Sequence, residues 1–253
     1  MTSPASEAID VFLQVVGCGD AFGAGGRLQT CFLIDAPTRV LIDCGATALI
    51  GMKRYGIDPA SIDMVVLTHL HGDHFGGLPF LLRETQVSAL RNRPLVIVGP
   101  PGHEERILAA TELLFPASRK AVWSFDLSFI PYEAHVPVSV KGVTVTAVPV
   151  VHSKATHPHG VRVECGGKVI AYSGDTEWID ELLSLSAGAD LFICECYQAE
   201  PRIRHHIDLV SLDRMRSRLT AKALLLTHFG PEMTLSSDPA FPMCAQDGMR
   251  LRI

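Results

Sequence analysis

The stretch THLHGDHFGG places three histidines and one aspartate within six positions. Imidazole nitrogens and carboxylate oxygens are common ligands of zinc and related divalent metals. His69 and His71 are two residues apart in a segment expected to be extended, so their side chains point the same way. Gly72 permits a sharp turn, after which Asp73 and His74 face elsewhere. The spacing therefore favours two metal sites, one held by the first pair and the other by the second.

Each of these sites needs further ligands, and three more candidates follow apolar runs elsewhere in the chain. His152 comes after VPVV, His228 after LLLT, and Asp175 after IAYSG. Because the ends of adjacent strands meet at one edge of a sheet, these side chains can converge there. His152 and His228 can supply one ligand apiece, and Asp175 can bridge both metals through its two oxygens. Nitrogen and oxygen ligation without thiolate suits zinc, with manganese or iron as alternatives.

The elements that must position these residues can be read from the spacing of the apolar side chains. Strands are predicted over residues 11–17, 30–35, 39–45, 64–69, 94–100, 143–152, 189–197 and 222–229, over two halves of 160–175 joined at Gly166-Gly167, and at an edge within 247–253. Helices are predicted over 103–115, 178–186 and 208–219, the last with Asp208 as its N-cap. Strands and helices mixed in two similar halves suggest two packed sheets with helices outside.

Composition sets limits on the class of protein. The chain has 253 residues, of which 47% are hydrophobic, so it can bury a large core. We expect one domain over 1–253, with 1–10 as a loose lead. No secretory signal precedes the first strand, and no apolar run approaches the roughly 18 residues of a membrane span. Seven scattered cysteines suggest reduced core residues and a cytoplasmic protein, and the net charge of −5 disfavours a dedicated nucleic-acid binder.

The order His69-x-His71-x-Asp73-His74, with its lead-in GIDPASIDMVVLTHLHGDHFGGLP, resembles the metallo-β-lactamase superfamily. The resemblance continues through His152, Asp175 and His228 and covers the chain from about Val11 to its end. It implies an α/β fold, a four-layer αββα sandwich of two mixed sheets packed face to face with helices outside. It also implies a dinuclear metal site at one edge of the sandwich.

Three further segments are most similar to the ribonuclease Z-like and cyclic-nucleotide phosphodiesterase-like branch: GDAFGAGGRLQT, VIAYSGDTEW and LFICECY with the later HHIDL. In ribonuclease Z a histidine downstream of the bridging aspartate assists proton transfer, and His206 sits at the matching place. The chain lacks a long Gly/Pro-rich tRNA-grasping insertion between His74 and His152. That departure and the acidic charge make tRNA or another nucleic acid a less favoured substrate.

The resemblance implies a dinuclear hydrolase, and a phosphodiesterase is the favoured activity. A hydroxide bridging two divalent metal ions would attack phosphorus, with Asp73 orienting it and His206 protonating the leaving oxygen. The expected substrate is a small anionic phosphodiester; no membrane partner is expected, and a homodimer is compatible with the sequence. Two alternatives stay open: a hydrolase of a lactone, thioester or β-lactam, and a metal-binding carrier or partner protein without turnover.

Several residues near this set have two interpretations. His205 could exchange roles with its neighbour His206. His157 and His159 could line the substrate cleft or be solvated loop residues. The basic segments PRIRHH and RMRSR could line an anionic-substrate pocket.

Other residues have a structural interpretation as the first choice. His103 and His135 are expected to be ordinary surface or loop residues. Cys194 and Cys196 alternate on a predicted strand and are expected to pack in the core rather than bind metal. The glycines of residues 23–26 could cradle a phosphate or form a loop that flanks the cleft.

Overall fold

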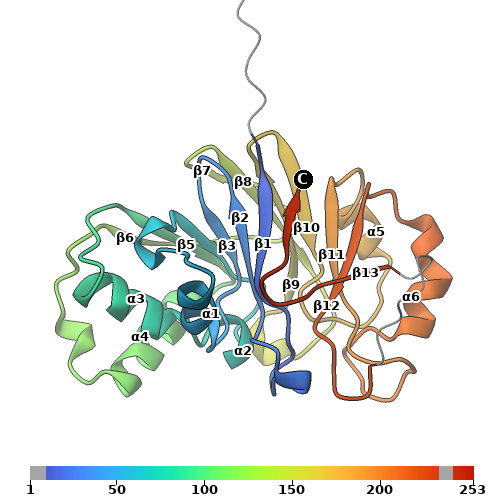
Figure 1. The fold of residues 1–253 in the computed structure, drawn as a ribbon, viewed down its shortest axis with the longest axis horizontal. Coiled ribbons are helices and arrows are strands. Elements are labelled where there is room, and N and C mark those ends of the chain that lie inside the picture. Colours follow the sequence, from blue (N-terminus) through green and yellow to red (C-terminus); the bar gives the residue numbers. More distant parts are fainter. Residues whose placement is uncertain (1–9, 234–241) are drawn as a thin grey trace, which may run out of the picture.

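A computed structural model describes residues 10–233 and 242–253, and within them two seven-stranded sheets pack face to face (Figure 1). The predicted lead at residues 1–10 lies outside the described residues except for Asp10. The first sheet has the order β14-β1-β2-β3-β4-β5-β6, with bounds β1 Phe12–Gly17, β2 Cys31–Asp35, β3 Val40–Ile42, β4 Met64–Val66, β5 Leu95–Gly99, β6 Leu127–Pro131 and β14 Arg250–Arg252.

The second sheet has the order β13-β12-β11-β10-β9-β8-β7. Its bounds are β7 Val138–Val140, β8 Val143–Pro149, β9 His159–Cys165, β10 Lys168–Tyr172, β11 Leu191–Glu195, β12 Leu224–Thr227 and β13 Met243–Cys244. Both sheets are mixed. Strands β3, β4, β5 and β6 run parallel to one another, as do β10, β11, β12 and β13, and all other neighbouring pairs are antiparallel.

The helices cover the outer faces of the two sheets. They are α1 Ala48–Arg54, α2 Gly72–Phe75, α3 Leu78–Val87, α4 His103–Leu114, α5 Glu181–Leu185 and α6 Leu209–Met215. In Figure 1, α1, α3 and α4 lie beside the first sheet, and α5 and α6 beside the second. This is the four-layer αββα sandwich of the metallo-β-lactamase fold, as predicted.

Three apolar clusters separate these layers. Residues such as Leu13 of β1 and Val163 of β9 fill the space between the sheets. Met52 of α1 belongs to the cluster under the helices of the first sheet, and Leu212 of α6 to that of the second. Strands buried on both faces read as nearly continuous apolar runs without alternation, and these runs are what made the strands visible in the sequence.

The hairpins and most strands agree with the sequence prediction, but several strands end earlier. β4 ends at Val66 and β8 at Pro149, so His69 and His152 lie in the loops beyond them. The helix predicted over 208–219 ends at Met215 and continues as a short 3₁₀ turn, with Asp208 as its N-cap. The shortened strands leave the candidate ligands on loops at a common edge.

Helix α1 was not predicted, because Gly51 interrupts its apolar pattern. A Cβ at this position would lie 2.8 Å from Val16 and 2.9 Å from Leu28. The glycine therefore lets the helix pack directly on β1, at the cost of a weaker helix signal. Helix α3 and strands β6 and β7 were also not predicted.

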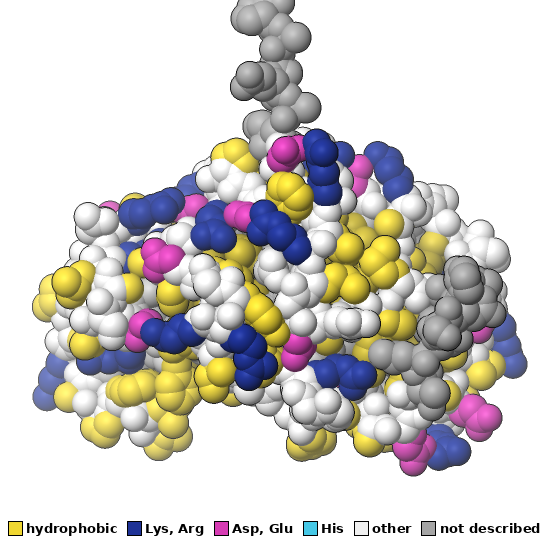
Figure 2. Space-filling model, in the orientation of Figure 1, with side chains coloured by type: hydrophobic (Ala, Val, Ile, Leu, Met, Phe, Trp, Pro, Cys, Tyr) yellow, Lys and Arg dark blue, Asp and Glu magenta, His cyan; other side chains and the backbone are white. Residues whose placement is uncertain are grey.

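The surface carries charges of both signs. Figure 2 shows acidic and basic side chains interspersed on one face of the described part of the chain. Ion pairs such as Arg250–Asp35, at 2.9 Å, contribute to this pattern. In the part of the chain that the structure describes, no helix is long and apolar enough to span a bilayer.

Candidate active site

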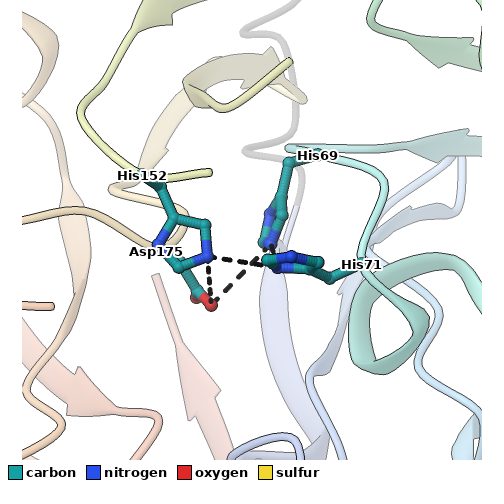
Figure 3. Close-up of side chains that lie close together, drawn as sticks. All are labelled: His69, His71, His152 and Asp175. Atoms are coloured by element: carbon teal, nitrogen blue, oxygen red, sulfur yellow. Dashed lines mark hydrogen bonds and ion pairs between the residues drawn. The ribbon is translucent and has the colours of Figure 1, made fainter. Parts of the chain in front are cut away.

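The first group of candidate ligands brings together three imidazoles and one carboxylate (Figure 3). His71 Nδ1 lies 3.1 Å from His69 Nε2 and 3.1 Å from His152 Nε2. Asp175 Oδ2 lies 3.8 Å from His69 Nε2 and 3.8 Å from His152 Nε2. All four ligand atoms lie within 4.8 Å of one another, a spacing compatible with one metal ion among them.

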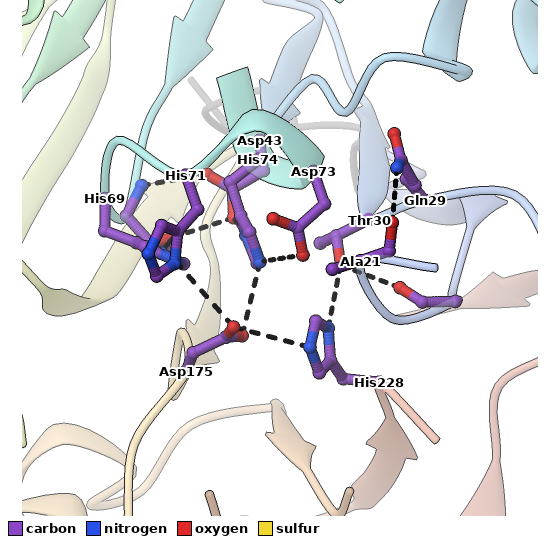
Figure 4. Close-up of polar contacts among 12 residues, drawn as sticks. Ala21, Gln29, Thr30, Asp43, His69, His71, Asp73, His74, Asp175 and His228 are labelled. Carbon is purple, nitrogen blue, oxygen red and sulfur yellow. Dashed lines mark hydrogen bonds and ion pairs between the residues drawn. The ribbon is translucent and has the colours of Figure 1, made fainter. Parts of the chain in front are cut away.

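The second group shares Asp175 with the first (Figure 4). His74 Nε2 lies 3.2 Å from Asp73 Oδ2 and 3.3 Å from Asp175 Oδ1. His228 Nε2 lies 3.3 Å from Asp175 Oδ2. Because Asp175 uses both oxygens, one carboxylate joins two groups of ligand atoms.

The outward-facing nitrogens of four imidazoles have protein partners. His69 Nδ1 is 3.1 Å from Thr68 Oγ1, and His74 Nδ1 is 2.7 Å from Asp43 Oδ2. His152 Nδ1 is 2.9 Å from the carbonyl of His205, and His228 Nδ1 is 3.3 Å from Thr30 Oγ1 (Figure 4 shows the pair at His228). Such partners fix the ring orientation and leave each Nε2 for a metal.

The chemistry of this donor set fits a divalent metal. His74 Nε2 and Asp175 Oδ1 are buried and lie 3.3 Å apart, but neither makes a hydrogen bond of normal geometry within the described residues. An unpaired buried polar atom is costly, so a ligand between these two atoms would remove a penalty. The clusters that could bind metal therefore lie where the sequence predicted them.

Protonation favours metal binding by the first group. Burial lowers the pKa of His69 well below its ordinary value and lowers that of His152 to about 4. Both imidazoles are therefore neutral at pH 7, with a lone pair available as metal ligands require.

The second group holds excess negative charge. Burial by itself would lower the pKa of His74, but the carboxylates of Asp175 and Asp73 raise it well above its ordinary value. Burial would raise the pKa of Asp175, but His228 and His74 hold it well below its usual range. One proton on His74 balances only part of the negative charge of the Asp73 and Asp175 carboxylates, so a cation at this place would be stabilised.

His206 stands beside both groups. Its ring centroid lies 5.0 Å from that of His152 and 5.6 Å from that of His228. Its Nδ1 is 3.1 Å from both oxygens of the buried Glu195 carboxylate. Burial would lower the pKa of His206, but Glu195 raises it to about 9. The imidazole is therefore protonated at pH 7.

A cleft of about 420 Å³ opens onto these residues. Its lining includes His71, Asp73, Asp175 and His206 together with the apolar side chains Phe22 and Ile203. The cleft thus exposes both ligand groups and the protonated imidazole to one substrate.

The chain is similar to a large family of known proteins. Residues 38–229 match the family described as the beta-lactamase superfamily domain, and they are most of the chain. The chain belongs to the metallo-β-lactamase superfamily. A ribonuclease Z from Mycobacterium bovis is 30% identical over 241 residues, covering 87% of this chain and 86% of that one. The protein is thus a metal-dependent hydrolase of this superfamily.

Solved structures agree on the fold. The metallo-β-lactamase fold protein YhfI of Bacillus subtilis has a TM-score of 0.79 at 22% identity and covers 96% of this chain and 99% of its own. Human tRNase Z, short form, has a TM-score of 0.75 at 23% identity, with coverage of 95% and 98%. At these identities the likeness concerns the fold alone.

The structure places the neighbouring residues His205 and His206 in different surroundings, which the sequence could not distinguish. The side chain of His205 is half exposed and lies 3.7 Å from Glu177, whereas His206 lines the cleft. His157 and His159 do not line it; His159 instead packs against Tyr132, with ring centroids 5.0 Å apart.

One expectation outside the ligand set is wrong. His103 is buried, with its two ring nitrogens near the carbonyls of Pro100 and Ile97, because it begins α4 just after β5 and its ring packs against Gly99. The turn expected at Gly72 is present, since Gly72 begins α2, which carries both Asp73 and His74. Gly72 does not adopt a left-handed conformation, and a Cβ there would meet no atom within 4 Å, so this turn does not require a glycine.

Other expectations have clear outcomes. Cys194 and Cys196 are buried in an apolar cluster, and all seven cysteines are free thiols. His135 is exposed, as predicted. The glycine loop at 23–26 follows Phe22, which lines the cleft, but does not itself line it. The segment RMRSR does not line the cleft; its Arg218 pairs with Asp180 at 3.2 Å.

The sequence analysis missed the partners of the functional imidazoles. Asp43 lies 31 positions before His74, at the end of the predicted strand RVLIDCG. Glu195 lies between Cys194 and Cys196 on the strand predicted over 189–197. A charged residue at the end of an apolar strand was the available signal in both cases.

Asp43 is the centre of a buried hydrogen-bond network beneath the site. Its carboxylate accepts hydrogen bonds from the amide and hydroxyl of Thr68, both at 2.8 Å, and contacts His74. Asp43→Ala should lower the free energy of unfolding of the metal-free protein by about 3–5 kcal/mol, because it leaves buried partners unpaired. Urea unfolding in the presence of a chelator measures this loss. Asp180→Ala, which removes an exposed pair, should cost less than about 1 kcal/mol. Equal losses in the two variants would contradict this account.

Proposed function

We propose that the protein is a dinuclear metal-dependent phosphodiesterase. The observation that carries the proposal is the shared carboxylate of Asp175, with Oδ1 3.3 Å from His74 Nε2 and Oδ2 3.3 Å from His228 Nε2. Oδ2 is also 3.8 Å from His69 Nε2 in the other group. One carboxylate between two complete ligand groups supports a bridged metal pair better than one isolated metal.

The proposed ligands divide as the sequence suggested. His69, His71 and His152 would hold one metal, and Asp73, His74 and His228 the other, with Asp175 common to both. Zinc is favoured by the nitrogen and oxygen donors, with manganese or iron as alternatives. Two such cations would lower the pKa of water and neutralise charge on the phosphoryl oxygens.

The side chains around the cleft would then handle protons and position substrate. Asp73 lines the cleft and can accept a hydrogen bond from the attacking water, which orients it toward phosphorus. Glu195 occupies Nδ1 of His206, so Nε2 is the atom that would give its proton to the leaving oxygen. The pKa of about 9 keeps this proton in place at pH 7 until it is transferred.

A phosphodiester is favoured over a carboxyl derivative by two observations. The leaving alkoxide of an unactivated phosphodiester needs a proton, and the Glu195–His206 pair supplies a donor. The Mycobacterium bovis relative is named as a ribonuclease, an enzyme that cleaves phosphodiesters. A small anionic substrate suits the cleft volume of about 420 Å³.

A substrate panel tests the proposed reaction. The protein is loaded with zinc, manganese or iron and assayed on phosphodiester, lactone, thioester and β-lactam substrates. We expect turnover of phosphodiesters in at least one metal form. Activity on carboxyl derivatives alone would overturn the proposal, and full metal loading without turnover would favour a carrier.

Metal content tests the ligand assignment independently of turnover. We expect about two metal ions per chain in the natural sequence and about one in His71→Ala, which disturbs only the first group. Asp175→Ala should weaken both sites, because its carboxylate belongs to both groups of candidate ligands. Elemental analysis after dialysis measures these values, and Asp180→Ala serves as a control that retains both ions. Retention of both ions by Asp175→Ala would contradict the bridging role.

The role of His206 predicts a change that depends on the leaving group. His206→Asn should lower kcat by about 10²–10⁴-fold for an alkyl leaving group and far less for p-nitrophenol. Metal content should not change.

Glu195 gives a second test of the same proton. Glu195→Gln removes the charge that raises the pKa of His206, so His206 loses its proton at lower pH. The alkaline limb of the pH–kcat profile should therefore move to lower pH. Glu177→Gln, at an exposed carboxylate, is the matched control. An unmoved alkaline limb in Glu195→Gln would remove His206 from the proposed role.

A further inference from the structure

A second cavity of about 250 Å³ adjoins the cleft. Its lining consists of Tyr197, Gln198, Arg202, Ile203, Pro231 and Glu232. Tyr197 and Ile203 also line the cleft, so the two cavities meet at these side chains. We call the second cavity the side pocket. Phe22 lines the cleft but not the side pocket, so a substitution at Phe22 changes the lining of the cleft alone.

The side pocket depends on a loop that holds Ile203 in a fixed position. Backbone hydrogen bonds from Tyr197 to Ile207 and from Leu209 to Gln198 close the base of this loop. Inside it, the buried Gln198 side chain accepts from the amide of Ile203 at 2.9 Å and donates to its carbonyl at 2.8 Å. The Ile203 side chain is 50% exposed despite this support. A buried amide thus holds an exposed apolar side chain at the junction of the cavities.

The side pocket borders the proposed proton donor. The Tyr197 ring stacks on His206, with centroids 4.7 Å apart and an interplanar angle of 28°. Gly230 makes room for this ring, since a Cβ there would lie 2.8 Å from Tyr197 Cζ. His206 and Tyr197 both line the cleft, and Tyr197 also lines the side pocket, so a group that reaches from the cleft into the side pocket would pass beside the imidazole of His206.

We propose that the side pocket receives the leaving group of the substrate, an inference that rests on the proposed function. Hydrolysis joins the water oxygen to phosphorus and breaks the bond to the leaving oxygen, which takes the proton of His206 Nε2. The products are a phosphomonoester and an alcohol, and a proton from the attacking water restores the imidazole. Because the leaving oxygen must reach His206, the group attached to it lies on the side of Tyr197 and Ile203.

The group that stays on phosphorus then lies along Phe22. This side chain is 91% exposed and follows β1 on a tight loop. The loop is held by Asp20 Oδ1, which accepts from the amide of Ala24 at 2.7 Å, and by Gln29 Nε2, which donates to the carbonyl of Ala21 at 2.8 Å. An exposed aromatic ring on an anchored loop at the wall of the cleft suits stacking with a flat substrate group.

The lining of the side pocket indicates the chemistry of the leaving group. Tyr197, Ile203 and Pro231 offer apolar surface for a flat ring. An ion pair between Arg202 and Glu232 borders the same cavity and presents both donors and acceptors. This combination suits an aromatic alcohol or a nucleoside, which has apolar faces and a polar edge.

Four synthetic diesters test whether the leaving group lies in the side pocket and the retained group lies along Phe22. Each combines a retained group, methyl or thymidine 5′-yl, with a leaving group, p-nitrophenyl or the larger 4-methylumbelliferyl. In Ile203→Trp, which narrows the side pocket, kcat/KM for umbelliferyl esters should fall at least about tenfold more than for p-nitrophenyl esters. This ratio should change equally with either retained group. Ratios within one variant are independent of the fraction of active protein.

Phe22→Ala provides the complementary measurement. Its kcat/KM for thymidine esters should fall about tenfold relative to methyl esters, with either leaving group, because a stacking surface is lost. Val122→Trp, at an exposed position that lines neither cavity, should change neither ratio. If Ile203→Trp leaves the leaving-group ratio unchanged, or alters the retained-group ratio instead, the assignment of the side pocket is wrong. If the natural sequence hydrolyses none of the four esters, the proposed function fails first.

Discussion

The buried carboxylate of Asp175 is the constraint on which the site depends. It is 2% exposed and lies where the loops after four strands meet. A charge in such a position is costly unless opposite charges or donors surround it. The imidazoles of both ligand groups gather around its two oxygens, and Gly174 makes this approach possible. Gly174 has φ 59°, and a Cβ there would lie 2.6 Å from the carbonyl of His159.

A second layer of contacts gives the imidazoles their orientation. Thr68, Asp43 and Thr30 contact the outward nitrogens of three histidines, and the carbonyl of His205 contacts that of the fourth. These contacts come from both sheets. The sandwich therefore does more than bring strand ends together, since it also fixes which nitrogen of each ring is available. His206 follows the same logic, with Glu195 as its partner and a proton in place of a metal.

Beyond the metal groups, the cleft owes its shape to two loops. One presents Phe22 after β1, and the other presents Ile203 after β11. Each is held by a side-chain amide, Gln29 in the first and Gln198 in the second. Loops of this kind vary easily on a constant sandwich, because their contacts are local. The shape of the cleft can therefore change while the two groups of candidate ligands stay the same.

The sequence by itself determined the fold class and the types of the candidate ligands through local pattern. Buried strands gave continuous apolar runs, and His69, His71, Asp73 and His74 stood close enough to be recognised together. Only the tertiary structure decided their partners, because Asp43 and Glu195 lie in other segments of the chain, and local pattern does not show that they contact His74 and His206. It also decided between His205 and His206, adjacent residues whose side chains the backbone directs to solvent and to the cleft. The left-handed φ of 67° at His205 marks this change of direction, which residue type and spacing do not encode.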